Sequence, residues 1–137
     1  MALDLIGDIH ALAPRRARQN RGRNAYLAGA AAEDAVQRHY ERQGLVCRAR
    51  RWRGASGEID LIFADGATII FVEVKQAPTH DLAAQALAPA QVRRILAAGE
   101  EFVGSEPAGS LTDRRYDLAM VDGTGRIAVI EQVFFEF

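Results

Sequence analysis

The chain has 137 residues, of which 49% are hydrophobic and 26% charged, and its formal net charge is −1. These values are typical of one soluble globular domain that can bury a core without disulfide or metal staples. No apolar run approaches the ~18 residues that span a bilayer, and the lone Cys47 excludes an internal disulfide framework, so we expect a cytoplasmic protein with no membrane partner.

Residues 1–23 are predicted to be an extension outside the domain, which we expect at residues 24–137. Asp4 and Asp8 interrupt the first apolar stretch, and no basic start precedes it, so it does not resemble a signal peptide. A short helix is possible there, ending at Pro14. The basic stretch that follows has no core pattern and is predicted to be either a basic arm or a disordered segment.

Residues 24–43 are predicted to form a helix, because apolar residues recur at helical spacing and Gly44 suits its end. Glu33 lies at the edge of the apolar face of this helix. A carboxylate at that place is either salt-bridged or functional, and the pattern leaves both open.

Three strands are expected next, at 45–52, 58–64 and 68–75, the last two as a hairpin around Asp65-Gly66. Residues 81–88 suggest a short helix, and Pro89 suits the first turn of a longer one that ends near Val103. Two final strands flank the turn at 122–125, giving a second hairpin. This order predicts an α/β three-layer sandwich, in which helices flank a central mixed sheet with the core order α-β-β-β-α-β.

The first hairpin concentrates charge. A loop centred on Asp65-Gly66 pairs Glu58 with Glu73 and Asp60 with Phe71, so four charged residues project from one face of the sheet. They are Glu58, Asp60, Glu73 and Lys75. The other face is expected to carry only apolar residues, namely Ile59, Leu61, Phe63, Ile70, Val72 and Val74.

Clustered carboxylates repel one another, and a divalent metal ion would offset that repulsion. Mg²⁺ (or Mn²⁺) suits a site with one or two carboxylates, retained waters and substrate phosphates. Lys75 is the only lysine beside 16 arginines, which suggests that this position needs an ammonium group. The alternative is a solvated strand face with alternating charges.

The stretches Gly57–Ile62 and Phe71–Lys75 (GEIDLI and FVEVK) resemble the uncharacterised YraN-like bacterial family. They also resemble the broader PD-(D/E)xK nuclease pattern of restriction enzymes and archaeal Holliday-junction resolvases. The resemblance extends from about Gly29 to Val121. It implies a restriction-endonuclease-like fold, with Asp60 and Glu73 as metal ligands, Lys75 as the catalytic lysine, and Glu33 binding the metal or a metal-bound water.

Other positions are less determined by the resemblance. Glu58 is either catalytic or structural. Arg115-Tyr116-Asp117 resembles a late element of the family, although a structural ion pair between Arg115 and Asp117 is the stronger reading. The chain departs from the family at Gln76 and Ala77, where an arginine is expected, and at Gln91, Arg93 and Arg94, where the family often has lysine. These departures would weaken phosphate binding. The alternative that this chain is a slow or inactive member of the family therefore stays open.

Positive charge is concentrated in the first half of the chain. Residues 1–57 carry 11 arginines against 5 acidic residues, which favours a polyanionic partner. The arginines expected to contact nucleic acid are Arg48, Arg50, Arg51, Arg53, Arg93 and Arg94, with Trp52 available to stack a base. The first four would equally suit an exposed strand edge protected against aggregation.

The resulting hypothesis is a metal-dependent endonuclease acting on DNA, with branched or structured DNA among its substrates. The alternatives are a non-catalytic nucleic-acid-binding protein on the same fold and a protein-interaction module whose acidic face binds a basic partner. A homodimer is a further option, because the apolar run 133–135 offers interface surface.

Overall fold

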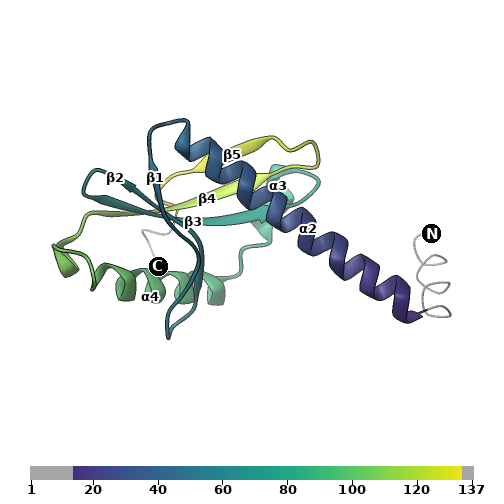
Figure 1. The fold of residues 1–137 in the computed structure, drawn as a ribbon, viewed down its shortest axis with the longest axis horizontal. Coiled ribbons are helices and arrows are strands. Elements are labelled where there is room, and N and C mark those ends of the chain that lie inside the picture. Colours follow the sequence, from purple (N-terminus) through teal and green to yellow (C-terminus); the bar gives the residue numbers. More distant parts are fainter. Residues whose placement is uncertain (1–13, 134–137) are drawn as a thin grey trace. The chain divides into compact units, whose positions relative to one another are not determined.

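The computed structural model describes the backbone of residues 14–133 and the side chains from residue 28 onward. The chain divides into two compact units, Met1–Ala31 and Ala32–Phe137. The described elements, in chain order, are α2 (Pro14–Glu41), β1 (Val46–Arg53), β2 (Glu58–Asp65), β3 (Thr68–Gln76), α3 (His80–Gln85), α4 (Pro89–Val103), the 3₁₀ turn η1 (Gly109–Leu111), β4 (Arg114–Val121) and β5 (Ile127–Ile130) (Figure 1).

The first helix begins well before residue 24, where we expected it. Pro14 opens α2, because the fixed φ of proline suits the first turn and the arginine, alanine and glutamine residues after it favour helix. The short helix considered before Pro14 lies outside the described residues. The compact units divide between Ala31 and Ala32, within α2. The part of the predicted arm that precedes Pro14 lies outside the described residues.

The sheet has five strands in the order β1-β2-β3-β4-β5. Only β3 and β4 run parallel among these strands, so the sheet is mixed, as predicted. One face packs against α2 from Ala32 onward, where Val36 and Tyr40 are buried among Phe63, Ile70 and their neighbours. The other face packs against α4. Helices on both faces of a mixed sheet confirm the predicted three-layer α/β sandwich.

The two helices that follow β3 are well specified by the sequence. Helix α4 has the predicted bounds, with Pro89 at its first turn and Gly104 at its C-cap. Helix α3 is capped by Thr79, whose hydroxyl oxygen accepts a hydrogen bond from the Leu82 amide at 3.2 Å. Strand β5 is shorter than predicted, because Gln132 adopts a left-handed φ of 53° that ends the extended run. The predicted continuation after Val133 lies outside the described residues.

The hairpin of β2 and β3 has a different register from the one predicted. Asp65 pairs with Thr68 and Leu61 with Val72, so the turn is Gly66-Ala67 and not Asp65-Gly66. Gly66 takes a φ of 61°, which glycine adopts without strain. Continuing this register by one residue places Asp60 opposite Glu73, instead of opposite Phe71.

The apolar face was also predicted incorrectly at one residue. Ile59 lies in the cluster beneath α4, whereas Leu61 lies in the cluster beneath α2. Alternation along β2 therefore breaks at Asp60. Strand β1 is irregular at the same level, because Arg51, between the paired residues Arg50 and Trp52, has a φ of 48°. Because β1 and β2 are both irregular at this point of the sheet, the side chain of Asp60 does not follow the regular alternation of the strand.

We expect Gly99→Ala to destabilise the fold, by about 1–3 kcal/mol. A Cβ at Gly99 would clash with the ring and hydroxyl of Tyr116, so the overpacking outweighs the usual gain in helix propensity. Gly29→Ala in α2 is the matched control, because a Cβ there meets nothing within 4 Å, and it should stabilise slightly. Urea unfolding of both variants measures the two effects. If both substitutions changed the free energy of unfolding in the same direction, the close packing of α4 would be contradicted.

Candidate active site

Two carboxyl groups meet where β2 and β3 run beside each other. Glu73 is only 4% exposed, and the carboxyl group of Asp60 lies close enough to raise its pKa. The same Asp60 accepts a hydrogen bond at its Oδ2 from the Val74 amide at 2.8 Å. The break in β2 at Asp60 thus lets the side chain serve as the acceptor for the neighbouring strand. The structure brings Asp60 and Glu73 together as an acidic pair, in which Glu73 is buried and Asp60 is half-buried.

Two donors contact one oxygen of this pair. The Lys75 ammonium lies 3.3 Å from Oε2 of Glu73, and the side-chain amide of Gln91 donates to the same oxygen. Lys75 comes from β3, two residues after Glu73, and Gln91 comes from the first turn of α4. The Lys75 side chain is 21% exposed, so the site is open to solvent on the lysine side.

The pKa of Glu73 is raised to about 8, mainly by burial and further by the nearby carboxyl group of Asp60, while Lys75 lowers it. A carboxyl group with such a pKa holds its proton at neutral pH. Glu73 therefore holds a proton at neutral pH, which removes part of the like-charge repulsion between the two groups. A cation placed between the two groups would do the same.

Stability without metal is expected to fall as the pH rises from about 5 to about 8. The pKa of Glu73 is about 8 in the folded state, against an ordinary value of 4.5, so between these values the folded state holds a proton that the unfolded state has lost. The slope has a limit of about 1.4 kcal/mol per pH unit. Urea unfolding at several pH values in the presence of a chelator measures this slope. In Glu73→Gln the free energy of unfolding should depend less on pH between these values. An unchanged slope in that variant would show that Glu73 is not the group responsible.

Glu33 is not brought to the acidic pair. Its carboxylate lies 3.0 Å from Nε of Arg51 and 3.8 Å from Arg50. Within residues 14–133, the structure contains no group of three or more His, Cys, Asp or Glu side chains arranged to hold a metal ion. Glu58 also lies apart, in an exposed ion pair with Arg53 at 2.9 Å.

The arginines of β1 are already engaged with carboxylates. Arg48 forms a two-pronged contact with Glu106 at 2.8 and 3.0 Å, and Arg50 lies 2.7 Å from Asp34. Arg51 and Arg53 pair with Glu33 and Glu58, as described above. A phosphate would have to compete with these carboxylates for the guanidinium groups. Arg93 and Arg94, by contrast, are exposed on α4.

Arg115 and Asp117 form a structural ion pair on the opposite side of the sheet. Asp117 is fully buried and accepts two hydrogen bonds from Arg115, each at 2.9 Å, and one from the Tyr40 hydroxyl at 2.8 Å. These hydrogen bonds raise the pKa of Arg115. The pair ties α2 to β4, which supports the structural alternative for both residues.

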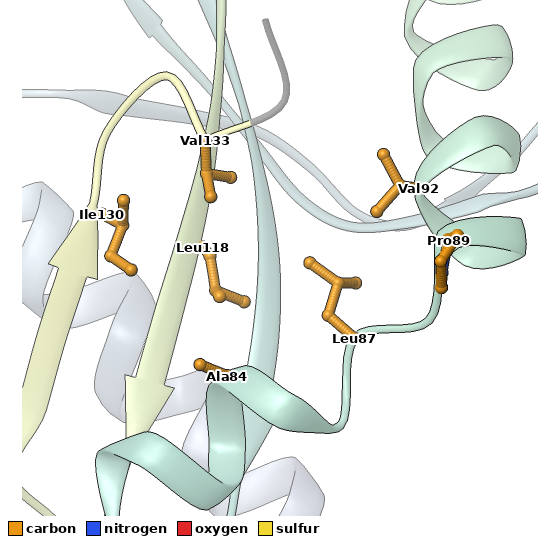
Figure 2. Close-up of a pocket in the computed structure, with 7 residues that line it drawn as sticks. All are labelled: Ala84, Leu87, Pro89, Val92, Leu118, Ile130 and Val133. Atoms are coloured by element: carbon orange, nitrogen blue, oxygen red, sulfur yellow. The ribbon is translucent and has the colours of Figure 1, made fainter. Parts of the chain in front are cut away.

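A small apolar pocket of about 210 Å³ lies beside the start of α4. Figure 2 shows side chains from α3, α4, β4 and β5 converging on it. Sequence analysis did not predict this pocket. Its lining includes Val133, the one described residue of the run 133–135 that we considered as interface surface; Phe134 and Phe135 lie outside the described residues. The lining residues are Ala84, Leu87, Pro89, Val92, Leu118, Ile130 and Val133.

Gln91 is the site residue that sequence reasoning missed. Its position in the chain was noted only as a departure from a family lysine. Nothing in the spacing connects it to Glu73, because the contact depends on how α4 lies across the sheet. The available signal was its place two residues after Pro89, in the first turn of a helix that follows β3.

Among residues 14–133, no helix is both long and apolar enough to cross a membrane. Residues 32–121 match the sequence profile of a family described as uncharacterised protein family UPF0102. The matched range contains β1 to β4 and every residue of the acidic pair and its two donors.

Named relatives agree with this match. A UPF0102 protein of Roseobacter denitrificans is 48% identical over 120 residues, which are 88% of this chain and 93% of the relative. One from Cereibacter sphaeroides is 52% identical over 113 residues, covering 82% of this chain and 97% of its own. One from Ruegeria pomeroyi is 49% identical over 119 residues, 87% of this chain and 97% of the relative. The chain therefore belongs to the uncharacterised protein family UPF0102.

Proposed function

We propose that this protein is a metal-dependent endonuclease that hydrolyses phosphodiester bonds in DNA. The observation that carries the proposal is the pairing of the half-buried Asp60 with the buried Glu73, with the Lys75 ammonium 3.3 Å from Glu73. The resemblance of GEIDLI and FVEVK to the PD-(D/E)xK pattern, and of the three-layer sandwich to the restriction-endonuclease-like fold, supports the same chemistry. By that resemblance, branched DNA of the kind that resolvases cut is included among the candidate substrates.

The acidic pair suits a hard divalent cation. Mg²⁺ is bound through one or two carboxylates and keeps several waters and substrate phosphates as its other ligands. Asp60 and Glu73 supply those carboxylates, and the charge of Asp60, which helps to raise the pKa of Glu73, favours a cation at this place. When bound, Mg²⁺ or Mn²⁺ would polarise a phosphoryl oxygen. Glu33 is held by Arg51, so we assign it the orientation of that arginine and no direct metal contact.

Lys75 supplies the remaining charge. Its ammonium group is close enough to Glu73 to be oriented by it, and it is partly exposed, so a scissile phosphate can reach it. An ammonium beside the reacting phosphate stabilises the negative charge that grows on the phosphoryl oxygens, and it can hold the attacking water. Lysine is suited to both because it is a compact charge with three donors on a flexible stem.

DNA binding is expected to weaken steeply with salt, and the double substitution Arg50→Ala with Arg51→Ala should make that slope shallower. Each phosphate contact that is lost removes about one unit from the slope of log affinity against log salt. Both guanidinium groups lie about 40% exposed on β1 and can exchange Asp34 and Glu33 for phosphate. Fluorescence anisotropy across a salt series measures the slope. An unchanged slope would remove both residues from the interface.

The second candidate is a non-catalytic nucleic-acid-binding protein on the same fold. It is favoured by one observation, that no third carboxylate joins Asp60 and Glu73 among the described residues. Such a protein would bind DNA with the same salt dependence but would not cut it. Its lone Cys47 suits a reducing cytoplasm, where both candidates would work.

Cleavage assays separate the two candidates. Duplex, single-stranded, flapped and four-way DNA are incubated with the protein in Mg²⁺, in Mn²⁺ and in a chelator. The endonuclease proposal expects metal-dependent cutting of at least one substrate. If the protein binds these DNAs but cuts none of them with either metal, the non-catalytic candidate is the correct one.

A further inference from the structure

We propose that Gln91 is a positioning residue, which holds the Glu73 carboxyl group by Oε2 so that Oε1 faces the divalent cation. The inference rests on the proposed function and extends it to a residue on a different layer of the sandwich. It starts from one contact, the hydrogen bond that the Gln91 side-chain amide donates to Oε2 of Glu73.

The amide of Gln91 is delivered by a rigid element. Gln91 lies in the first turn of α4, where Pro89 fixes the backbone at the helix start. The next residue, Val92, is 3% exposed, and Ile95 one turn further is 2% exposed, both packed against the sheet. The backbone of Gln91 therefore cannot shift without disturbing the core. A donor on such an anchor restricts the carboxyl group more than a donor on a loop would.

Both donors occupy the same oxygen of Glu73. Lys75 and Gln91 contact Oε2, and an ionised carboxylate has two oxygens that can each accept more than one bond. With Oε2 engaged by the lysine and the amide, Glu73 would keep its other oxygen for binding a divalent cation, which Asp60 would also help to hold. Hydrogen bonds to ligating carboxylates orient them in this way in metal sites generally.

The side chain at this place is a neutral amide, where the family often has lysine. It donates a hydrogen bond to Glu73 without adding positive charge beside the cation. Lys75 can turn toward a phosphate when DNA arrives, because its side chain is 21% exposed, and Gln91 then remains as the donor that keeps Glu73 in place. The chain thereby separates two tasks, positioning by Gln91 and charge stabilisation by Lys75.

The test compares Gln91→Met with the parent protein and with Gln85→Met. Methionine keeps the length of the side chain and suits a helix but cannot donate, and Gln85 is an exposed glutamine at the end of α3 that serves as the matched control. Titration calorimetry with Mn²⁺ alone gives the affinity without any turnover. We expect Gln91→Met to weaken Mn²⁺ binding about 10-fold or more, in the range seen for partners of ligating residues, and Gln85→Met to leave it unchanged.

Kinetics on a cleaved DNA provide the second readout. A positioning role predicts that Gln91→Met lowers kcat while KM for DNA stays near the parent value, because Gln91 does not contact the substrate. Gln91→Ala, which removes the amide and suits the helix, should act in the same way, and it keeps the test decisive if the methionine variant does not fold.

The outcomes distinguish the inference from the function on which it rests. If the parent binds Mn²⁺ and both Gln91 variants bind it equally well, Gln91 does not position Glu73, and the proposed function stands. If the parent itself binds no Mn²⁺, the inference and the metal-dependent function both fail.

Discussion

Lys75→Ala is expected to lower the rate of metal-dependent DNA cleavage by about 10²–10³-fold, the usual cost of removing one well-placed electrostatic contact from a transition state. The ammonium lies beside Glu73, so its removal deletes positive charge where the metal and the scissile phosphate would meet. DNA affinity should change little, because Lys75 is one of 17 basic residues. Single-turnover cleavage and anisotropy in a chelator measure the two quantities separately.

Two further variants sharpen this result. Lys75→Arg keeps the charge but replaces a compact ammonium by a planar guanidinium, and we expect it to restore only part of the rate. Asp60→Ala should lose Mn²⁺ binding as well as rate, and it also leaves the Val74 amide without its acceptor. If both Lys75 variants cut DNA as the parent does, the activity belongs to another site or to a contaminant.

Asp117→Ala is expected to lower the free energy of unfolding by about 3–5 kcal/mol, the cost of breaking a buried pair by removing one partner. Asp117 is fully buried and accepts hydrogen bonds from Arg115 and Tyr40, so the alanine variant leaves the Tyr40 phenol without this acceptor and the Arg115 guanidinium with Glu131 at 3.5 Å. The total free energy of unfolding of a domain of this kind is about 5–15 kcal/mol. Urea unfolding at pH 7 measures the loss.

Asp34→Ala is the control for this loss. It breaks the ion pair with Arg50, in which the side chains are 47% and 40% exposed, and exposed pairs contribute about 0–1 kcal/mol. Asp117→Asn keeps an acceptor for Tyr40, so its loss of unfolding free energy should lie between those of Asp34→Ala and Asp117→Ala. Equal losses for Asp34→Ala and Asp117→Ala would show that the network around Asp117 does not anchor α2.

The elements of the fold could be predicted because local patterns determine them. Helix α4 has a proline start and a glycine stop, and its apolar residues recur at helical spacing, so its bounds followed from the sequence. The register of the first hairpin did not follow, because both Asp65-Gly66 and Gly66-Ala67 allow a tight turn. Only the structure shows that Gly66 takes the first turn position, which puts Asp60 opposite Glu73.

The candidate site could be predicted in part, where its residues share one hairpin. Asp60, Glu73 and Lys75 lie close together because neighbouring strands place them there. Gln91 and the ion pairs of the β1 arginines depend on contacts between layers, which no periodicity encodes. The expectation for Glu33 was drawn from a resemblance, and the structure places that carboxylate with Arg51.

The parallel pairing of β3 with β4 has a consequence for the order in which the molecule assembles. The hairpin of β2 and β3 closes over a two-residue turn and can form within microseconds. Strand β4 can join only after the crossover through α3 and α4 is complete, because parallel strands need such a connection. The nascent hairpin therefore holds Asp60 and Glu73 side by side in water before α4 covers them. We therefore expect desolvation of the carboxyl pair to be a late event in folding, which coincides with the arrival of Gln91.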